Sequence, residues 1–139
     1  MGSAPRRLVI DTHWVLDLWV FHDVRAHALR KALEDGQVQW LACGPMRAEL
    51  ERVLDYPAVL RWRQAQDLTA AAVLARFEHH ARMQPLPAAS PWRCRDPDDQ
   101  VFIDLACAQQ ADLLSRDRAV RALAPALARA GVQVRADWP

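Results

Sequence analysis

Residues 93–120 read RCRDPDDQVFIDLACAQQADLLSRDRAV, and this stretch determines the fold class more clearly than any other part of the chain. After an acidic turn, apolar residues return at steps of three and four from Phe102 to beyond Cys107. That spacing predicts an amphipathic helix. Asp98 and Asp99 suit its N-terminus, where the helix dipole favours negative charge. The stretch is therefore expected to lead from an acidic loop into a helix, with Asp99 in the first turn.

The end of the same stretch predicts a short parallel strand followed by a carboxylate. Residues 112–115 are apolar enough for a buried strand, and the charged residues 116–118 end it. Asp117 is thereby expected just past the carboxyl end of a strand, on the side where open α/β sheets carry their sites. Asp99 and Asp117, placed in this way, can share a metal ion. A further helix is expected over residues 119–130.

A second strand that ends on an acid opens the chain. Residues 7–10 form an apolar run with β-branched residues, and the run ends at Asp11. A buried carboxylate at that point requires a cation, hydrogen-bond donors or solvent. The competing interpretation is that Asp11 only caps the next helix, a role that Asp often fills. Because Asp99 and Asp117 are expected at the same edge of the sheet, we favour a shared site.

The remaining elements alternate between strand and helix. A second strand is expected over residues 37–42, then a helix that opens at Gly44 and Pro45, and a last strand over residues 132–134. This order predicts a Rossmann-like, three-layer α/β/α domain with a central, mainly parallel sheet of four to five strands and right-handed crossovers. The first and fourth strands are expected to be neighbours at the topological switch point.

The middle of the chain is predicted to be helical. Residues 58–83 are rich in Ala, Arg and Gln and are expected to form two helices, the second capped by Asp67. His79 and His80 would face different directions on a helix, so we expect solvated side chains rather than ligands of one ion. The Pro-rich segment that follows is expected to be an extended loop, with Leu86 in a short edge strand.

The apolar run near the N-terminus predicts a buried helix. Trp14 and Trp19 are therefore expected in the core, and the alternative is that they form platforms on which bases stack. Asp17 is a weaker candidate ligand than Asp11, because a helix would separate the two acids by more than a turn.

Length and composition favour one globular domain. The chain has 139 residues, of which 52% are hydrophobic and 25% charged, enough to bury a single core. We expect a disordered or expression-derived N-terminus over residues 1–6, one domain over residues 7–135 and a tail over residues 136–139. No apolar run approaches the about 18 residues of a membrane span, so a cytoplasmic protein without a membrane contact is expected. The 3 Cys residues are widely spaced and predict neither a disulfide framework nor a structural zinc site.

The formal net charge is only +1, which by itself argues against a nucleic-acid partner. Its distribution changes that interpretation. If several carboxylates gather at one metal site, the basic residues remain as excess positive surface, and all of them except Lys31 are Arg. An Arg-lined substrate groove and a compositional bias without function are both compatible with this pattern.

Three other α/β site types are disfavoured by residues that the chain lacks. No G-x-G-x-x-G turn follows the first strand, as a dinucleotide-binding fold requires. A phosphatase of the haloacid-dehalogenase type needs a second Asp two residues after Asp11, where His13 stands. A response-regulator receiver needs a Lys after a late strand, whereas Lys31 is early. Metal-dependent phosphodiester hydrolysis remains as the best interpretation of the acids.

Three patterns, in order along the chain, resemble one known family. They are RLVIDT at residues 7–12, AELERVLDYP at residues 48–57 and RDPDDQVFIDLACAQQADLLSRD at residues 95–117. Together they resemble the PIN-domain ribonucleases, and most closely the PIN-family toxin components of bacterial toxin–antitoxin systems. The resemblance extends from about Arg7 to Val134.

The resemblance implies a PIN-like fold and a metal-dependent ribonuclease that hydrolyses RNA phosphodiester bonds and leaves a 5′-phosphate. It implies that Asp11, Glu49, Asp99 and Asp117 form the catalytic metal cluster, in which Glu49 rather than Glu51 is the acid of the second pattern. Oxygen-only ligands select hard cations, so Mg²⁺ or Mn²⁺ is expected. A protein antitoxin that blocks the pocket with an Arg or Lys, and self-association as a homodimer, are further implications.

Four residues are expected to support the cluster, and they are Thr12, His13, Asp98 and Ser115. Two positions depart from the family pattern. His13 stands where an Asn commonly ties the site together, and Ala119 stands where another acid is common. These departures keep a second hypothesis open, in which a catalytically weakened PIN-like domain acts as a nucleic-acid-binding or protein-binding regulatory module.

Overall fold

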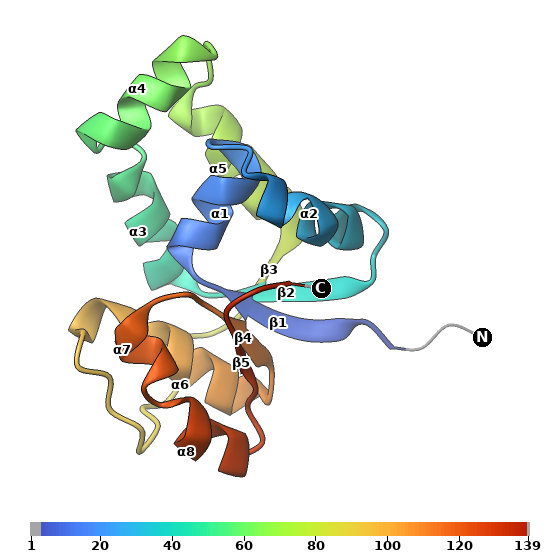
Figure 1. Ribbon diagram of the computed structural model, residues 1–139, viewed down its shortest axis with the longest axis vertical. Helices are drawn as coiled ribbons and strands as arrows, with labels where there is room; N and C mark the ends of the chain where they lie inside the picture. The colour runs from blue at the N-terminus through green and yellow to red at the C-terminus, as the bar shows by residue number, and fades with distance from the viewer. Residues whose placement is uncertain (1–3, 139) are drawn as a thin grey trace.

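The computed structural model describes residues 4–138 and shows alternating strands and helices (Figure 1). Residues 1–3 and 139 lie outside this description, and with them half of the predicted N-terminal extension and the end of the predicted tail. In chain order the elements, with η for a 3-10 helix, are β1 (Arg6–Ile10), α1 (Thr12–Trp19), η1 (Val24–Ala26), α2 (His27–Glu34), β2 (Val38–Ala42), α3 (Gly44–Val53), α4 (Pro57–Ala65), α5 (Ala70–His80), β3 (Ala81–Met83), η2 (Pro97–Asp99), α6 (Gln100–Gln109), β4 (Asp112–Leu114), α7 (Arg118–Arg121), α8 (Ala124–Arg129) and β5 (Val134–Arg135).

The strands form one parallel sheet in the order β3-β2-β1-β4-β5. Leu8 in β1 pairs with Trp40 of β2 on one side and with Asp112 of β4 on the other. Successive strands are added in one direction as far as β3, and the chain then returns to the other side of β1. The predicted α/β fold is confirmed, and so is the predicted switch point between the first and fourth strands.

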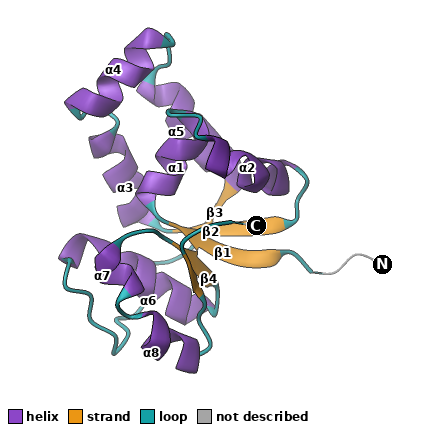
Figure 2. Ribbon diagram, viewed as in Figure 1, coloured by secondary structure: helices purple, strands orange, loops and turns teal. Residues whose placement is uncertain are grey.

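Helices cover both faces of this sheet, which gives the three layers predicted (Figures 1 and 2). The helices from α1 to α5 lie on one side, where α2 packs on β2 and α3 packs on α5. The helices from α6 to α8 lie on the other side, where α6 packs on β1 and β4. Among residues 4–138, no helix is both long enough and apolar enough to cross a membrane.

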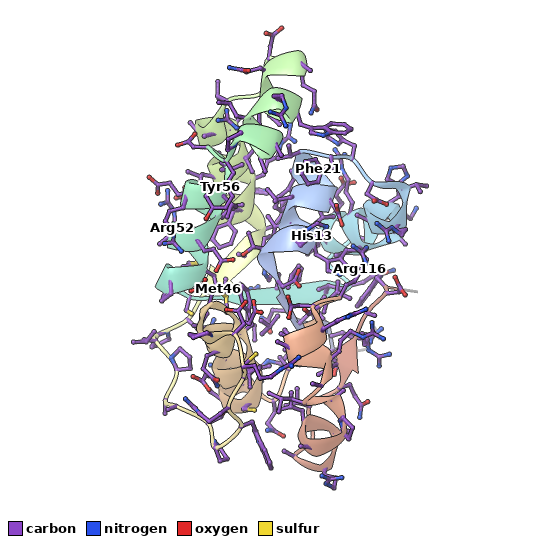
Figure 3. All side chains as sticks on the ribbon, turned by 60° about the vertical axis from the view of Figure 1, so that its left-hand side comes forward. His13, Phe21, Met46, Arg52, Tyr56 and Arg116 are labelled. Atoms are coloured by element: carbon purple, nitrogen blue, oxygen red, sulfur yellow. The ribbon has the colours of Figure 1, made fainter. Side chains whose placement is uncertain are left out.

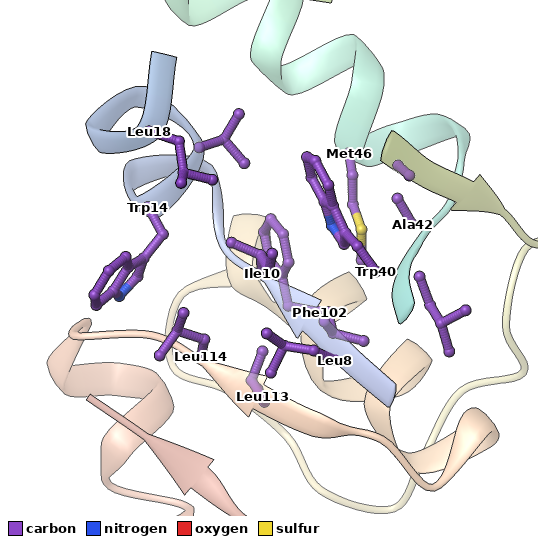
Figure 4. Close-up of a cluster of buried hydrophobic side chains, with 14 of the residues drawn as sticks. Leu8, Ile10, Trp14, Leu18, Trp40, Ala42, Met46, Phe102, Leu113 and Leu114 are labelled. Carbon is purple, nitrogen blue, oxygen red and sulfur yellow. The ribbon is translucent and has the colours of Figure 1, made fainter. Parts of the chain in front are cut away.

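The core lies between the sheet and these two helix layers (Figure 4). Trp40 of β2 contacts two other rings, Trp19 at 5.5 Å and Phe77 at 5.0 Å between centroids. Aromatic pairs at these separations add stability beyond the area that they bury. Trp14 and Trp19 are 0% and 3% exposed, so both belong to the core and neither offers a free face to a base.

Two local predictions in the middle of the chain are wrong. The third strand is β3, at the end of α5, and not the segment around Leu86. Leu86 is 71% exposed and belongs to the loop between β3 and η2. Pairing of Ala81 with Trp40 fixes this strand, so long-range contacts decide what a three-residue segment cannot. Thr69, not Asp67, caps α5, because the Thr69 hydroxyl accepts the Ala72 amide proton at 3.1 Å.

Two further boundaries differ from the predictions near the chain ends. The first strand begins at Arg6, and the last strand covers Val134–Arg135 instead of residues 132–134. The described part of the predicted tail packs on the domain. The Trp138 ring lies 4.6 Å from the Arg6 guanidinium carbon, and Asp137 approaches Arg116 at 3.8 Å.

Candidate metal centre and active site

A pocket of about 420 Å³ opens at the carboxyl ends of β1 and β4, the edge that the topology marks for a ligand. His13 on α1 and Arg116 after β4, both labelled in Figure 3, are among the residues that line this opening. The residues that line the pocket are Asp11, Thr12, His13, Trp14, Arg25, Glu49, Asp99, Arg116 and Asp117. All four acids that the sequence proposed as ligands are therefore brought to one pocket, from four separate parts of the chain.

Asp11 lies at the junction of β1 and α1 and is 7% exposed. Its amide donates to the carbonyl of Leu114 at 3.1 Å, which holds it at the end of β4. One carboxylate oxygen accepts the Trp14 amide proton at 3.0 Å and so caps α1. Burial raises the pKa of Asp11, and the Ser115 hydroxyl and the Trp14 amide oppose that rise. Asp11 thus caps α1 and also lines the pocket, so the capping role does not exclude the predicted shared site.

Glu49 reaches the pocket from α3 and is held there by Thr12. The Thr12 hydroxyl donates to Glu49 Oε1 at 2.5 Å, across the space between α1 and α3. Burial raises the pKa of Glu49, the Thr12 hydrogen bond opposes this, and the nearby Asp98 adds to it. Glu51 instead pairs with Arg47 at 3.2 Å outside the pocket. Glu49 is therefore the acid of this helix that faces the other carboxylates.

Asp99 is a carboxyl with a strongly raised pKa. It stands between η2 and α6, and its Oδ2 atom is buried without a hydrogen-bond donor among residues 4–138. Burial raises its pKa to about 7, and the charges of Asp117, Asp96 and Asp11 contribute to the rise. A half-buried carboxylate beside other carboxylates is the arrangement in which one group keeps its proton at neutral pH. A cation in this pocket would offset the repulsion between the carboxylates, so that Asp99 could lose its proton.

Asp117 is held by the turn between β4 and α7. Its carboxylate accepts the amide proton of Ala119 at 2.8 Å, and its own amide donates to the Ser115 hydroxyl oxygen at 3.1 Å. Ser115 is fully buried, so its hydroxyl anchors the turn to the interior of the protein. At the position where the family pattern has another acid, Ala119 supplies only a backbone donor to Asp117.

Two of the predicted supporting residues do not hold the acids together. His13 lines the pocket, but its side chain is 64% exposed and its nearest carboxylate is Asp17 at 3.8 Å. Asp98 is exposed at the rim, and its amide donates to Asp96 in the η2 turn. Thr12 and Ser115, in contrast, make the hydrogen bonds that a supporting role requires. The connection predicted for position 13 is made by position 12.

The pocket also has a basic wall, and the sequence did not indicate which Arg residues would form it. Arg116 donates to the buried carboxylate of Asp17 at 2.9 Å, and its guanidinium carbon lies 3.9 Å from the centroid of the Trp14 ring. The Nε and Nη2 atoms of Arg116 are buried without a hydrogen-bond acceptor among the described residues. Arg25 joins this wall and is paired with Asp23 at 2.9 Å. Asp17 is therefore the partner of Arg116 and not a ligand.

The chemistry of the acidic wall fits a divalent cation. Its donors are all carboxylate oxygens, as Mg²⁺ and Mn²⁺ prefer, and the buried Asp99 Oδ2 is a donor atom without a partner. The carboxylates are spread around the pocket, and no three His, Cys, Asp or Glu side chains within residues 4–138 are placed to hold an ion as they stand. The acids therefore fit such an ion by their chemistry and their location. Their side chains must move closer together to coordinate it.

Comparison with known proteins agrees with this geometry. The model of a family described as PIN domain matches residues 7–119, a range that includes all four acids. No curated protein matches the chain significantly.

Proposed function

This chain belongs to the PIN-domain family, whose members are typically nucleases, and from that premise we propose that it is a metal-dependent endoribonuclease. The observation that carries the proposal is the convergence of Asp11, Glu49, Asp99 and Asp117 on one pocket, with the pKa of Asp99 raised to about 7. Such a cluster is costly without a cation, because like charges repel and burial disfavours ionisation. A site built at this cost is typical of catalysis rather than of stability.

The four acids would hold Mg²⁺ or Mn²⁺, in keeping with the general use of divalent metals by the family. When bound, such an ion supplies a nucleophile near neutral pH and offsets negative charge on the phosphoryl oxygens. In the metal-free chain, burial and the charge of Asp117 raise the pKa of Asp99 to about 7, so this carboxyl can take up a proton near neutral pH. The Thr12 hydroxyl keeps Glu49 turned into the pocket. The cationic Arg116 lines the same pocket, where a phosphate would enter.

The finer role that we propose is that of a toxin in a toxin–antitoxin system, acting on RNA in the cytoplasm. It is supported by the resemblance of the three sequence patterns to PIN-family toxins. The expected protein partner is an antitoxin that places an Arg or Lys side chain against the acids, where a cation offsets their charge. A homodimer is proposed on the same ground. Purification with the product of a neighbouring small gene, and loss of cleavage on its addition, would test the partner.

Cleavage of a labelled RNA with both paired and unpaired segments tests the enzyme directly. The purified chain is assayed with Mn²⁺, with Mg²⁺ and with chelator, beside the Asp11→Asn and Asp99→Asn variants. We expect metal-dependent products with 5′-phosphate ends, and losses of at least about 100-fold in both variants. Glu51→Gln is the matched control, because this acid lies outside the pocket lining and pairs with Arg47. Equal cleavage by Asp99→Asn and the unmodified chain would refute the proposal.

A second candidate function is that of a weakened PIN domain that binds RNA or protein without cutting. The observation in its favour is His13, whose side chain is 64% exposed and has Asp17, not one of the four acids, as its salt-bridge partner. The same assay separates the two functions, because a binding module retains RNA but yields no metal-dependent products. His13→Asn would then restore cleavage if this one position had disabled the site.

A further inference from the structure

A row of aromatic rings leads away from the acidic pocket. The His13 ring, which lines the pocket, lies 6.4 Å from the Phe21 ring, and the Phe21 ring lies 5.4 Å from the Trp62 ring on α4. Figure 3 shows His13, near the start of α1, and above it Phe21, which follows the end of this helix. Trp62 is 52% exposed, although large aromatic side chains are usually buried. The row therefore ends in an open ring.

The position of Trp62 is fixed by a hydrogen-bonded link between α4 and the end of α1. The Gln66 side chain donates both to the carbonyl of Val20, at 2.8 Å, and to that of Trp62, at 2.9 Å. The His22 ring pairs with the same Gln66 side chain at 2.8 Å. Phe21 lies between these contacts and meets Trp62 edge to face. A ring held in this way loses little conformational entropy when a ligand stacks on it.

A cation accompanies the exposed ring. Arg61 and Trp62 line one shallow hollow with Ala58 and Ala65, and Arg61 forms no salt bridge within the described part of the chain. At the other end of the row, Arg25 lines the acidic pocket. Aromatic rings interleaved with guanidinium groups are what proteins use to bind unpaired nucleic acid, because rings stack on bases while guanidinium groups contact phosphates.

We propose that this row is the track of a single-stranded RNA substrate, with an unstacked base on Trp62 and a backbone phosphate on Arg61. The inference rests on the proposed ribonuclease function and assigns Trp62 and Arg61 as a binding subsite for an unpaired stretch of the substrate, away from the acids. An apolar hollow would also suit a protein partner or a second copy of the chain. Continuity of the rings with the acidic pocket favours RNA, since a strand that is cut at the acids must leave the pocket along one of its walls.

Binding is measured in the Asp99→Asn background, with a labelled single-stranded RNA of about 12 nucleotides and with the matching duplex. Trp62→Ala should weaken single-strand binding about ten-fold, the effect of losing one stacked base, and Trp62→Phe should retain most of the affinity. Duplex binding should not change, because paired bases cannot reach the ring. Arg61→Gln should lower the salt dependence of single-strand binding by about 0.7 in log–log slope, and Trp62→Ala should leave that slope unchanged.

The exposed Leu86→Ala variant controls for loss of apolar surface, and thermal unfolding controls for folding. Equal weakening for single strand and duplex, or none for single strand, would overturn the track. So would a Trp62→Ala variant that binds RNA normally but changes from dimer to monomer or no longer binds an antitoxin. Cleavage by the unmodified chain separates this result from the ribonuclease proposal. If the chain cuts RNA and Trp62→Ala leaves KM unchanged, only the track fails, whereas a rise in KM at constant kcat supports it.

Discussion

Replacing Asp99 with Asn should stabilise the metal-free protein while it abolishes cleavage. The pKa of Asp99 is raised from its ordinary 3.8 to about 7, chiefly by burial and then by the charge of Asp117. Between these two pH values the folded chain binds more protons than the unfolded chain, so its free energy of unfolding falls as pH rises. Above about pH 7 the folded protein bears the whole free-energy cost of ionising Asp99. Below about pH 4, where the carboxyl is protonated in both the folded and the unfolded chain, this cost vanishes.

The magnitude follows from the pKa change. A rise from 3.8 to about 7 sets a ceiling of about 4 kcal/mol, at about 1.4 kcal/mol for each pH unit. Solvent screens a half-buried group, and we therefore expect about 1–2 kcal/mol. Asn has a similar shape and no charge, and Asp99 makes no side-chain capping hydrogen bond to α6 that the substitution would remove. Asp99→Asn should thus gain about 1–2 kcal/mol at about pH 8 and almost nothing at about pH 4.

Urea unfolding in chelator, across this pH range, measures the difference. Asp98→Asn is the matched control, since it makes the same chemical change in the same turn at an exposed position. Addition of Mn²⁺ should make the unmodified chain more stable than Asp99→Asn, because an ion that binds the native carboxylates stabilises the unmodified chain more than the variant. The reasoning is refuted if Asp99→Asn is no more stable than the unmodified chain at about pH 8, or if its gain does not depend on pH.

Two further predictions concern residues of the site, and a third concerns a glycine that follows α8. Thr12→Val removes the hydrogen bond to Glu49, so kcat/KM should fall about ten-fold and the acid limb of the pH–rate profile should move to higher pH, while Thr12→Ser should retain both. Arg116→Met leaves the carboxylate of Asp17 buried without its partner and should cost about 3 kcal/mol in urea unfolding, most of which the double variant with Asp17→Leu should recover. Gly131→Ala should lower the free energy of unfolding by about 1–2 kcal/mol, because Gly131 has a φ of 89°, and an unchanged urea midpoint would contradict this.

The acids at strand ends could be predicted from sequence because a local signal marks each of them. Asp11 and Asp117 end short apolar runs, and parallel strands bring their carboxyl ends to one edge of the sheet. Glu49 had no such signal. On the helix it differs from Glu51 only by its direction, and the family resemblance chose between them. The structure agrees with that choice, since Glu51 pairs with Arg47 while Glu49 meets Thr12.

The basic wall could not be predicted because its contacts join distant parts of the chain. Arg116 and Asp17 are 99 positions apart, and nothing local indicates that they form a pair. The prediction of the third strand failed for a related reason. Ala81, Arg82 and Met83 carry little apolar signal, and their pairing with β2 depends on the whole α3–α5 crossover. The exposure of Trp62 could not be predicted, because an exposed ring and a core ring look the same in a helical sequence.

The measurement that tests the account most directly is calorimetric titration of the metal-free chain with Mn²⁺ in two buffers of different ionisation enthalpy. The pocket acids should bind the ion and release protons at pH 7, because burial raises the pKa of Asp99 to about 7. Asp99→Asn should bind at least about ten-fold more weakly with a smaller release, and Glu51→Gln, which changes an acid that pairs with Arg47 outside the pocket, should behave like the unmodified chain. Absence of Mn²⁺ binding at millimolar concentration, or equal affinity and proton release in Asp99→Asn, would contradict the claim that these carboxylates form one metal centre.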